Sequence, residues 1–224
     1  MALILVAGFM LDEDLWSDMA DSLERFGPVL HVDPRHAASI EEMAVEALAM
    51  APARFALIGF SMGGYVARAI QRLAPERVTK LALVATSARG DSAIQARRMA
   101  ALSDANPAAF RGLSKQSIRQ SLAPERETDA ALVARIQAMS LRLGGQVFHR
   151  QARFRREGDL AQLAAITCPT LIVAGSKDRL RSVEEAVELQ QAIPQARLEL
   201  IDCGHMIPME QPAALAAMIE DFLS

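Results

Sequence analysis

The chain has 224 residues, 51% of them hydrophobic, so it is long enough to bury a sizeable core as one domain. Its formal net charge of -3 and isoelectric point near 5.8 give no reason to expect a nucleic acid as partner. The apolar start at residues 2–6 is too short for a signal peptide, lacks preceding basic residues and soon meets Asp12-Glu13-Asp14. No apolar run approaches the roughly 20 residues that cross a membrane. We therefore expect a cytoplasmic protein with no membrane contact.

Short apolar runs alternate with helical segments along most of the chain. The predicted strands are, in chain order, 2–7, 29–32, 55–59, 81–85, 170–174 and 198–201. Candidate helices lie between them at 15–26, 39–50, 62–74, 182–192 and 209–223. This alternation predicts an α/β fold with a doubly wound, mostly parallel sheet, whose site lies at the carboxyl ends of the strands.

The alternation breaks once, between residues 88 and 165, where helical pieces rich in Ala, Arg, Leu and Gln replace the strands. We expect residues 1–87 and 166–224 to form the core and residues 88–165 to be a helical cap inserted in it. Residues 90–160 hold 12 Lys or Arg against 7 Asp or Glu, a balance of +5. This excess suits a solvated helical surface, or a cap that attracts an anionic substrate or an acidic carrier protein. The candidates for the second role are Arg150, Arg153, Arg155 and Arg156.

A serine lies between two glycines in Gly59-Phe60-Ser61-Met62-Gly63, where a buried strand turns into a helix. So sharp a turn crowds the neighbouring backbone, and the small residues Gly59 and Gly63 meet that need. The turn would hold the Ser61 hydroxyl at the tip of a strand, beside the first N–H groups of a helix. Gly-x-Ser-x-Gly in this strand–turn–helix context predicts a nucleophile elbow.

A serine hydroxyl needs a base to take its proton, and that base needs an acid to orient it. Of the four histidines, His205 alone follows the last predicted strand, in a loop at the carboxyl end of the sheet. We expect it to be the base. His31 lies in a strand and His36 in the next loop, where structural or surface roles fit; His149 lies in the cap and is a candidate to touch the substrate.

The acid is expected in the loop after the preceding strand. Gly175 makes the exit turn and Asp178 follows three residues later, in reach of the loop that holds His205. Asp202 is the rival, although it lies too close to His205 in sequence to orient its ring easily. The chain order Ser61, Asp178, His205 is the order of the α/β-hydrolases.

Attack on an acyl carbon creates an oxyanion, which needs N–H donors fixed in advance. Met62 at the helix start supplies one main-chain N–H, and Phe9, after the first strand, is expected to supply the second, with Met10 as the alternative. Phe9, Met10, Met206 and Met209 could form an apolar, adaptable pocket, although plain core packing explains Met209 equally well.

The two cysteines are predicted to be free thiols. Cys168 precedes one strand and Cys203 follows its predicted neighbour, so they would lie at opposite ends of the sheet, ~16 Å apart. A disulfide tolerates at most ~7 Å between Cα atoms.

Several stretches together resemble the α/β-hydrolase superfamily over nearly the whole chain outside the cap. They are Gly59-Phe60-Ser61-Met62-Gly63-Gly64, Ala74-Pro75-Glu76-Arg77-Val78, Gly175-Ser176-Lys177-Asp178 and Gly204-His205. Residues 59–90 look like small bacterial esterases and 3-oxoadipate enol-lactonase-like hydrolases. The resemblance implies Ser61 as nucleophile, His205 as base, Asp178 as acid, and Phe9 and Met62 as oxyanion donors.

Two departures from that family pattern stand out. Many members carry His-Gly at the oxyanion loop, where this chain has Ala7-Gly8, which loosens support for the loop without removing the donor. The chain also begins at the strand that is usually third, so we expect a minimal six-stranded sheet without the first antiparallel strands.

These residues predict a serine hydrolase that cleaves a carboxylic ester, lactone or thioester of a small acyl substrate through an acyl-enzyme. Carbon–carbon bond hydrolysis, or a cofactor-free lyase step, could use the same three residues, and the cap would decide between these reactions. A ligand-binding protein that keeps the three residues without turnover is the rival from another class. No glycine-rich nucleotide loop or metal-ligand cluster occurs, so we expect no cofactor and no metal.

Overall fold

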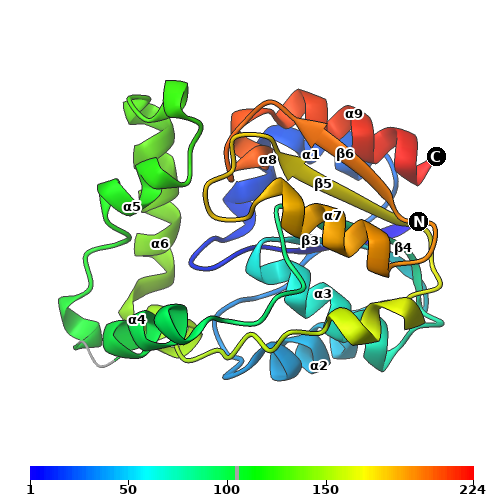
Figure 1. Cartoon of the computed structure of the whole chain (residues 1–224), viewed down its shortest axis with the longest axis horizontal. Coiled ribbons are helices and arrows are strands. Elements are labelled where there is room, and N and C mark those ends of the chain that lie inside the picture. The colour runs from blue at the N-terminus through cyan, green and yellow to red at the C-terminus, as the bar shows by residue number, and fades with distance from the viewer. Residues whose placement is uncertain (104–105) are drawn as a thin grey trace.

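The computed structural model describes residues 1–103 and 106–224 and contains a six-stranded sheet with strand order β2-β1-β3-β4-β5-β6. Each neighbouring pair of strands is parallel. The strands are β1 (Ala2–Val6), β2 (Val29–His31), β3 (Phe55–Phe60), β4 (Val78–Val84), β5 (Thr170–Gly175) and β6 (Arg197–Ile201). The predicted six-stranded α/β sheet is therefore confirmed (Figure 1).

The predicted bounds of β4 were wrong at both ends. The strand begins at Val78, which pairs with Phe55 of β3, and it includes the polar residues Thr79 and Lys80 because both find hydrogen-bond partners. Thr79 Oγ1 donates to the Phe55 carbonyl at 2.9 Å, and Lys80 Nζ donates to the Phe222 carbonyl at 2.7 Å. The strand ends at Val84, since Ala85 takes a left-handed φ of 48°.

Helices cover both faces of the sheet (Figure 1). One face carries α2 (Ile40–Met50), α3 (Met62–Leu73) and α7 (Val183–Ala192), and the other carries a 3₁₀ helix (Glu13–Met19), α1 (Ala20–Glu24) and α9 (Pro212–Leu223). Side chains alternate between the two layers along each strand: Leu3 and Leu5 pack on the α9 side, whereas Ile4 and Val6 pack on the α3 side. Such double coverage explains why the strands read as unbroken apolar runs.

The segment 88–165 leaves the sheet after β4 and returns to it at β5. It contains α4 (Ala93–Ser103), α5 (Lys115–Gln120), α6 (Ala130–Gln151) and 3₁₀ turns at Pro107–Ala109, Pro124–Arg126 and Leu160–Ala165, with no strand among its described residues. Helices α4, α5 and α6 stand together beyond the carboxyl ends of the strands (Figure 1). Leu163 near its end, and Ile166 just after it, are buried in the layer that holds α3 and α7.

Ion pairs tie α6 to residues 12–18, at and within the 3₁₀ helix that follows β1. Arg142 Nε contacts Asp12 at 2.8 Å and its Nη2 contacts Asp14 at 3.0 Å, while Arg135 contacts Asp14 and Asp18 at 3.0 and 2.6 Å. The two arginines lie seven residues apart, which is two helical turns, so both face the same acidic residues. This contact holds the first part of α6 over the sheet edge.

Helix α6 is kinked at Gly144, whose φ of 77° and ψ of 174° are not helical. In the described residues, nothing lies within 4 Å of a Cβ built at Gly144, so backbone conformation and not space is the reason for glycine there. None of the described helices is long and apolar enough to cross a membrane.

Cys168 and Cys203 are free thiols, as predicted. Burial raises the pKa of the Cys168 thiol. For Cys203, burial together with the nearby carboxylates of Glu210 and Asp178 raises the thiol pKa to about 12.

Candidate active site

Ser61 occupies the turn between β3 and α3 with φ 53° and ψ -115°, a conformation that L-residues rarely adopt. Neighbouring groups hold it there. Its N–H donates to the Val84 carbonyl at 2.9 Å, and its own carbonyl accepts from Gly64 N at 3.0 Å and from Thr86 Oγ1 at 2.7 Å. Backbone strain of this kind persists only where the surroundings enforce it, and it gathers at functional sites.

The two glycines around Ser61 are needed for different contacts. A Cβ on Gly59 would lie 2.5 Å from the Gly63 carbonyl oxygen, across the turn itself. A Cβ on Gly63 would lie 2.2 Å from the carbonyl oxygen of Val6, at the end of β1. Helix α3 therefore starts against the first strand of the chain, a contact that the pattern around Ser61 does not reveal.

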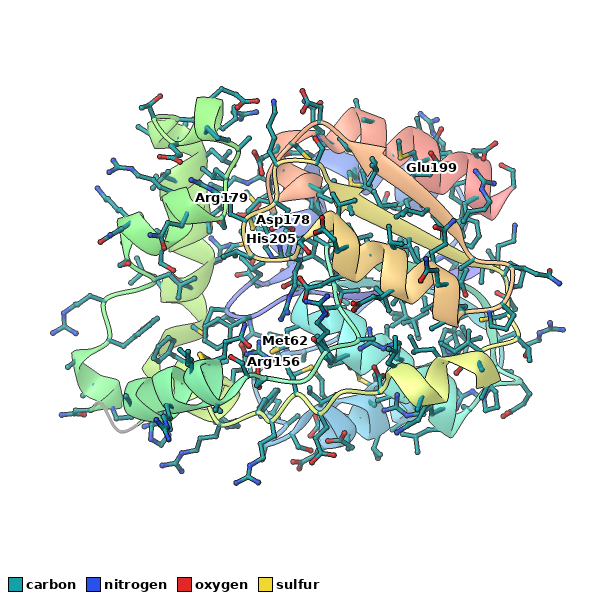
Figure 2. The ribbon with its side chains drawn as sticks, viewed as in Figure 1. Met62, Arg156, Asp178, Arg179, Glu199 and His205 are labelled. Carbon is teal, nitrogen blue, oxygen red and sulfur yellow. The ribbon has the colours of Figure 1, made fainter. Side chains whose placement is uncertain are left out.

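Ser61, His205 and Asp178 form a hydrogen-bonded chain. His205 Nε2 lies 2.9 Å from Ser61 Oγ, and His205 Nδ1 lies 2.7 Å from Asp178 Oδ2. The Asp178 side chain is fully buried and that of His205 nearly so. The two lie side by side beyond the strand ends (Figure 2).

Main-chain groups orient the Asp178 carboxylate. Its Oδ1 accepts from the N–H groups of Leu180 at 2.7 Å and Arg181 at 2.9 Å, which leaves Oδ2 for His205. With Nδ1 donating to that carboxylate, Nε2 carries a lone pair that can accept the Ser61 proton.

The rival acid points elsewhere. Asp202 is exposed and binds Lys177 Nζ at 3.0 Å and Ser176 Oγ at 3.0 Å. These hydrogen bonds lower the pKa of the Asp202 carboxyl, and the bond to Lys177 has the larger effect.

Two main-chain N–H groups near Ser61, those of Phe9 and Met62, have no protein acceptor among the described residues. The Met10 N–H, in contrast, donates to Gln151 Oε1 of α6 at 2.9 Å. Of the two alternatives after β1, Phe9 is therefore the one with a free donor.

A cavity of about 630 Å³ opens onto Ser61 and His205 between the sheet and the segment 88–165. Its apolar lining is Phe9, Leu11, Phe60, Met99, Phe110, Leu113, Ile118, Ile136, Phe148, Leu180 and Met206. Phe148 joins both sides, with its ring centroid 5.7 Å from that of Phe9 and 4.8 Å from that of Phe110. The volume and lining suit a small apolar molecule.

The charged residues described in the cavity lining are all arginines, namely Arg111, Arg156 and Arg181. Arg156 pairs with Asp91 at 2.7 Å and Arg181 with Glu185 at 3.3 Å. The Arg111 guanidinium donates only to the carbonyls of Ala108 and Phe110 among the described residues, so its charge has no carboxylate partner there. The cavity is therefore apolar with a cationic edge.

The predicted pocket residues divide. Met206 lines the cavity, whereas Met10 does not, because it is fully buried against Leu143 and Val147 under α6. His149 is half-buried on α6 and also lies outside the lining. Met209 is buried in the core layer that holds α9.

A larger cavity, of about 810 Å³, lies near the β2 edge, between the loop after β1 and α1, and is lined by Trp16 and His31 among others. It contains none of Ser61, His205 and Asp178. No group of three or more His, Cys, Asp or Glu in the described part of the chain could hold a metal ion.

Sequence reasoning missed the groups that the segment 88–165 brings to the site. Phe110, Phe148 and Gln151 carry no local signal of function, since each reads as an ordinary residue of a helical region. Glu210 is also missed as a site residue, although it ends the short helix α8 (Ile207–Glu210) directly after the His205 loop and is buried.

Residues 3–218 match the model of the alpha/beta hydrolase family. The chain is 28% identical over 252 residues to a pimeloyl-[acyl-carrier protein] methyl ester esterase of Photobacterium profundum, covering 99% of this chain and 94% of that protein. A malate-bound thermophilic esterase from Thermogutta terrifontis superposes with a TM-score of 0.85 at 26% identity, covering 100% of this chain and 89% of that one. An enol-lactonase from Burkholderia xenovorans LB400 shares the fold, with a TM-score of 0.79 at 22% identity over 99% of this chain and 90% of that one.

The chain therefore belongs to the alpha/beta hydrolase family, as the sequence motifs led us to expect, and it is a hydrolase.

Proposed function

We propose that the protein is a serine hydrolase that cleaves a carboxylic ester, lactone or thioester through an acyl-enzyme. The observation that carries this proposal is the hydrogen-bonded chain Ser61–His205–Asp178, with Ser61 and His205 facing an apolar cavity. A hydroxyl, a neutral imidazole and a buried carboxylate in that order are the parts that nucleophilic acyl transfer needs.

In the first half-reaction, Ser61 Oγ attacks the acyl carbon while its proton passes to His205 Nε2. The carbonyl oxygen becomes an oxyanion, which the N–H groups of Phe9 and Met62 stabilise, each worth on the order of 3 kcal/mol in the transition state. The tetrahedral intermediate then collapses, the bond to the leaving alkoxide or thiolate breaks, and His205 returns its proton to that group.

In the second half-reaction, water replaces the leaving group. His205 Nε2 takes a proton from the water as its oxygen attacks the acyl carbon, and the bond to Ser61 Oγ breaks as that oxygen regains a proton. Asp178 keeps the imidazole in the required tautomer and stabilises the imidazolium in both halves.

We also propose that residues 88–165 act as the cap and residues 1–87 and 166–224 as the core. Support comes from the cavity, whose lining draws on both parts. Its aromatic and aliphatic side chains suit an acyl chain.

A carrier-bound acyl substrate fits the charges of the cap. Arg111, Arg119, Arg153 and Arg155 are exposed there, and a relative that spans this chain is a pimeloyl-[acyl-carrier protein] methyl ester esterase. Carrier attraction would weaken with salt, since exposed charges are screened beyond ~10 Å at 0.1 M.

The test is a panel of p-nitrophenyl esters, lactones and acyl thioesters against the wild type and Ser61→Ala, with a fluorophosphonate probe as second readout. We expect the probe to modify Ser61 and the variant to lose ester hydrolysis while keeping its melting temperature. A wild type that resists the probe and hydrolyses none of the panel would refute the proposal, and tight ligand binding without turnover would point to a binding protein.

A further inference from the structure

The loop that carries His205 is bound to the cap through main-chain groups. The N–H of His205 donates to the carbonyl of Ser121 at 2.8 Å, although the two residues belong to different parts of the chain. Close packing accompanies this bond, because a Cβ on Gly204 would lie 2.3 Å from Ala123 N. Residues 121–123 of the cap therefore touch the loop directly.

Glu210 joins the same two segments with one carboxylate. Its Oε2 accepts from Ala123 N of the cap at 2.8 Å and from Gly204 N at 3.3 Å, while its Oε1 accepts from Met206 N at 3.1 Å. Gly204 and Met206 flank His205 in sequence. The Glu210 side chain thus binds the backbone on both sides of His205 and also binds the cap.

Among the described residues, the donors to the Glu210 carboxylate are all main-chain N–H groups. Glu210 is only 5% exposed, and among the described residues no Lys, Arg or His forms an ion pair with its side chain. Arg126 Nη1 donates to the main-chain carbonyl of Glu210 at 3.3 Å, while Arg126 Nη2 pairs with Asp129. A carboxylate buried without a cation is costly, and an apolar residue would fill the same space at lower cost.

Other charged groups around this junction are already paired. Lys177 bridges Glu125 and Asp202 at 2.5 and 3.0 Å, and Arg179 pairs with Glu127 at 2.7 Å. Arg179 also donates to the carbonyls of Arg119 and Leu122 at 3.0 and 2.9 Å. The loop that carries Asp178 is therefore also hydrogen-bonded to this part of the cap. Arg179 lies beside Asp178 and His205 in Figure 2.

From these contacts we infer that Glu210 is a positioning residue, which fixes the His205 ring only while residues 121–123 of the cap are seated. Docking of residues 121–123 and placement of the His205 ring then occur together, because the Glu210 carboxylate binds both the cap and the histidine loop. The inference rests on the proposed role of His205 as base. It assigns to Glu210 no contact with the substrate.

The first test is Glu210→Gln, which keeps the shape but replaces one acceptor oxygen by an N–H₂ group that faces N–H donors. We expect kcat for a p-nitrophenyl ester to fall by about 100-fold with KM changed less than threefold, since small displacements of a reacting group cost about that much. The matched control is Glu42→Gln, at the start of α2, where a carboxylate accepts from Ala38 N at 2.7 Å far from the site. It should leave kcat within twofold.

The second test is hydrogen–deuterium exchange, which needs no turnover. In Glu210→Gln we expect the peptides that contain 121–127 and 203–207 to gain exchange together, while β3 and α3 stay protected as in the wild type. The inference is overturned if only one of the two segments loosens, if neither does, or if kcat equals that of the control. A wild type without esterase activity would refute the proposed function but would leave this exchange result readable.

Gly204→Ala provides an independent variant should Glu210→Gln fail to fold. Its new methyl group would lie 2.3 Å from Ala123 N and 2.8 Å from Glu210 Oε1, so it would push both the cap residues and the carboxylate away from the loop. The same paired gain of exchange and the same selective loss of kcat are expected, and an unchanged exchange pattern would contradict the link.

Discussion

Two short regions of the molecule hold the proposed nucleophile and base by different means. The serine turn, residues 59–64, is held by steric contacts and main-chain bonds within the core, as at Gly63 against β1 and Ser61 against β4. The histidine loop, residues 203–206, is held by groups that include the cap residues Ser121 and Ala123. The proposed nucleophile is therefore held by the core alone, whereas the loop of the proposed base is held partly by residues of the segment 88–165.

The largest expected effect comes from removing the acceptor of the His205 Nδ1–H group while leaving the serine turn unchanged. Asp178→Asn keeps the packing but removes the acceptor that selects the Nδ1–H tautomer, so we expect kcat to fall about 10⁴-fold with the melting temperature little changed. Ester hydrolysis and thermal unfolding measure the two quantities. Asp202→Asn is the control and should stay within twofold of the wild type, because its carboxylate binds only Ser176 and Lys177 among the described residues. Equal losses in both variants would contradict the assignment of the acid.

The serine turn can be broken sterically. Gly63→Ala places a methyl group 2.2 Å from the Val6 carbonyl oxygen, so β1 and α3 must move apart. We expect the free energy of unfolding to fall by about 1–3 kcal/mol and kcat to fall by about 100-fold. Urea unfolding and ester hydrolysis are the measurements. Gly158→Ala, whose new Cβ would find its nearest neighbour at 3.1 Å, should cost much less, and a comparable loss there would refute the steric argument.

Cys203, in the histidine loop, should make the free energy of unfolding depend on pH. The pKa of the Cys203 thiol is raised from 9.0 to about 12 in the folded protein, so the folded state keeps its proton while the unfolded state loses it. Stability from this group is complete below pH 9 and is lost as the pH rises toward 12, by no more than about 1.4 kcal/mol per pH unit. Between pH 8 and pH 11, the free energy of unfolding measured in urea should therefore fall less steeply with pH in Cys203→Ala than in the wild type. Parallel slopes would contradict this expectation.

The smallest effect concerns the ion pairs that hold the cap to the loop after β1. Arg142→Gln removes contacts with Asp12 and Asp14, and the Arg142 side chain is 47% exposed, so we expect a loss of no more than about 1 kcal/mol in the free energy of unfolding. Salt should shrink the difference. Arg197→Gln, which loses exposed pairs on β6 and α9, is the control for a surface charge remote from the cap. A loss above 2 kcal/mol would show that these pairs do more than orient α6.

The sequence allowed the core to be predicted because its signals are local. Buried parallel strands read as short apolar runs, and Gly59, Ser61 and Gly63 mark a strand–turn–helix junction within five residues. Even the loops of Asp178 and His205 could be placed, since parallel strands bring their carboxyl ends to one edge. The bounds of β4 were harder, because Thr79 and Lys80 are polar and their partners lie far away in the chain.

The cavity and its supports could not be predicted in the same way. Met10 was expected in the pocket, yet α6 covers it completely and Gln151 takes its N–H. Phe110 follows the 3₁₀ turn at Pro107–Ala109 and stacks on Phe148 of α6. A contact of this kind depends on how separate elements pack, and no periodicity within one element records it.

By itself, then, the sequence determined the alternation of strands and helices, the strained serine turn and the order Ser61, Asp178, His205, because each follows from residues close together or from the rule for parallel strand ends. Only the tertiary structure decided which N–H groups remain free, which side chains line the cavity and that Glu210 holds residues 121–123 and the histidine loop together. The physical reason is that these features are hydrogen bonds and contacts between segments up to about 140 residues apart, such as Met10 with Gln151 and Ala123 with Glu210. Their partners become neighbours only when the segment 88–165 folds back over the sheet.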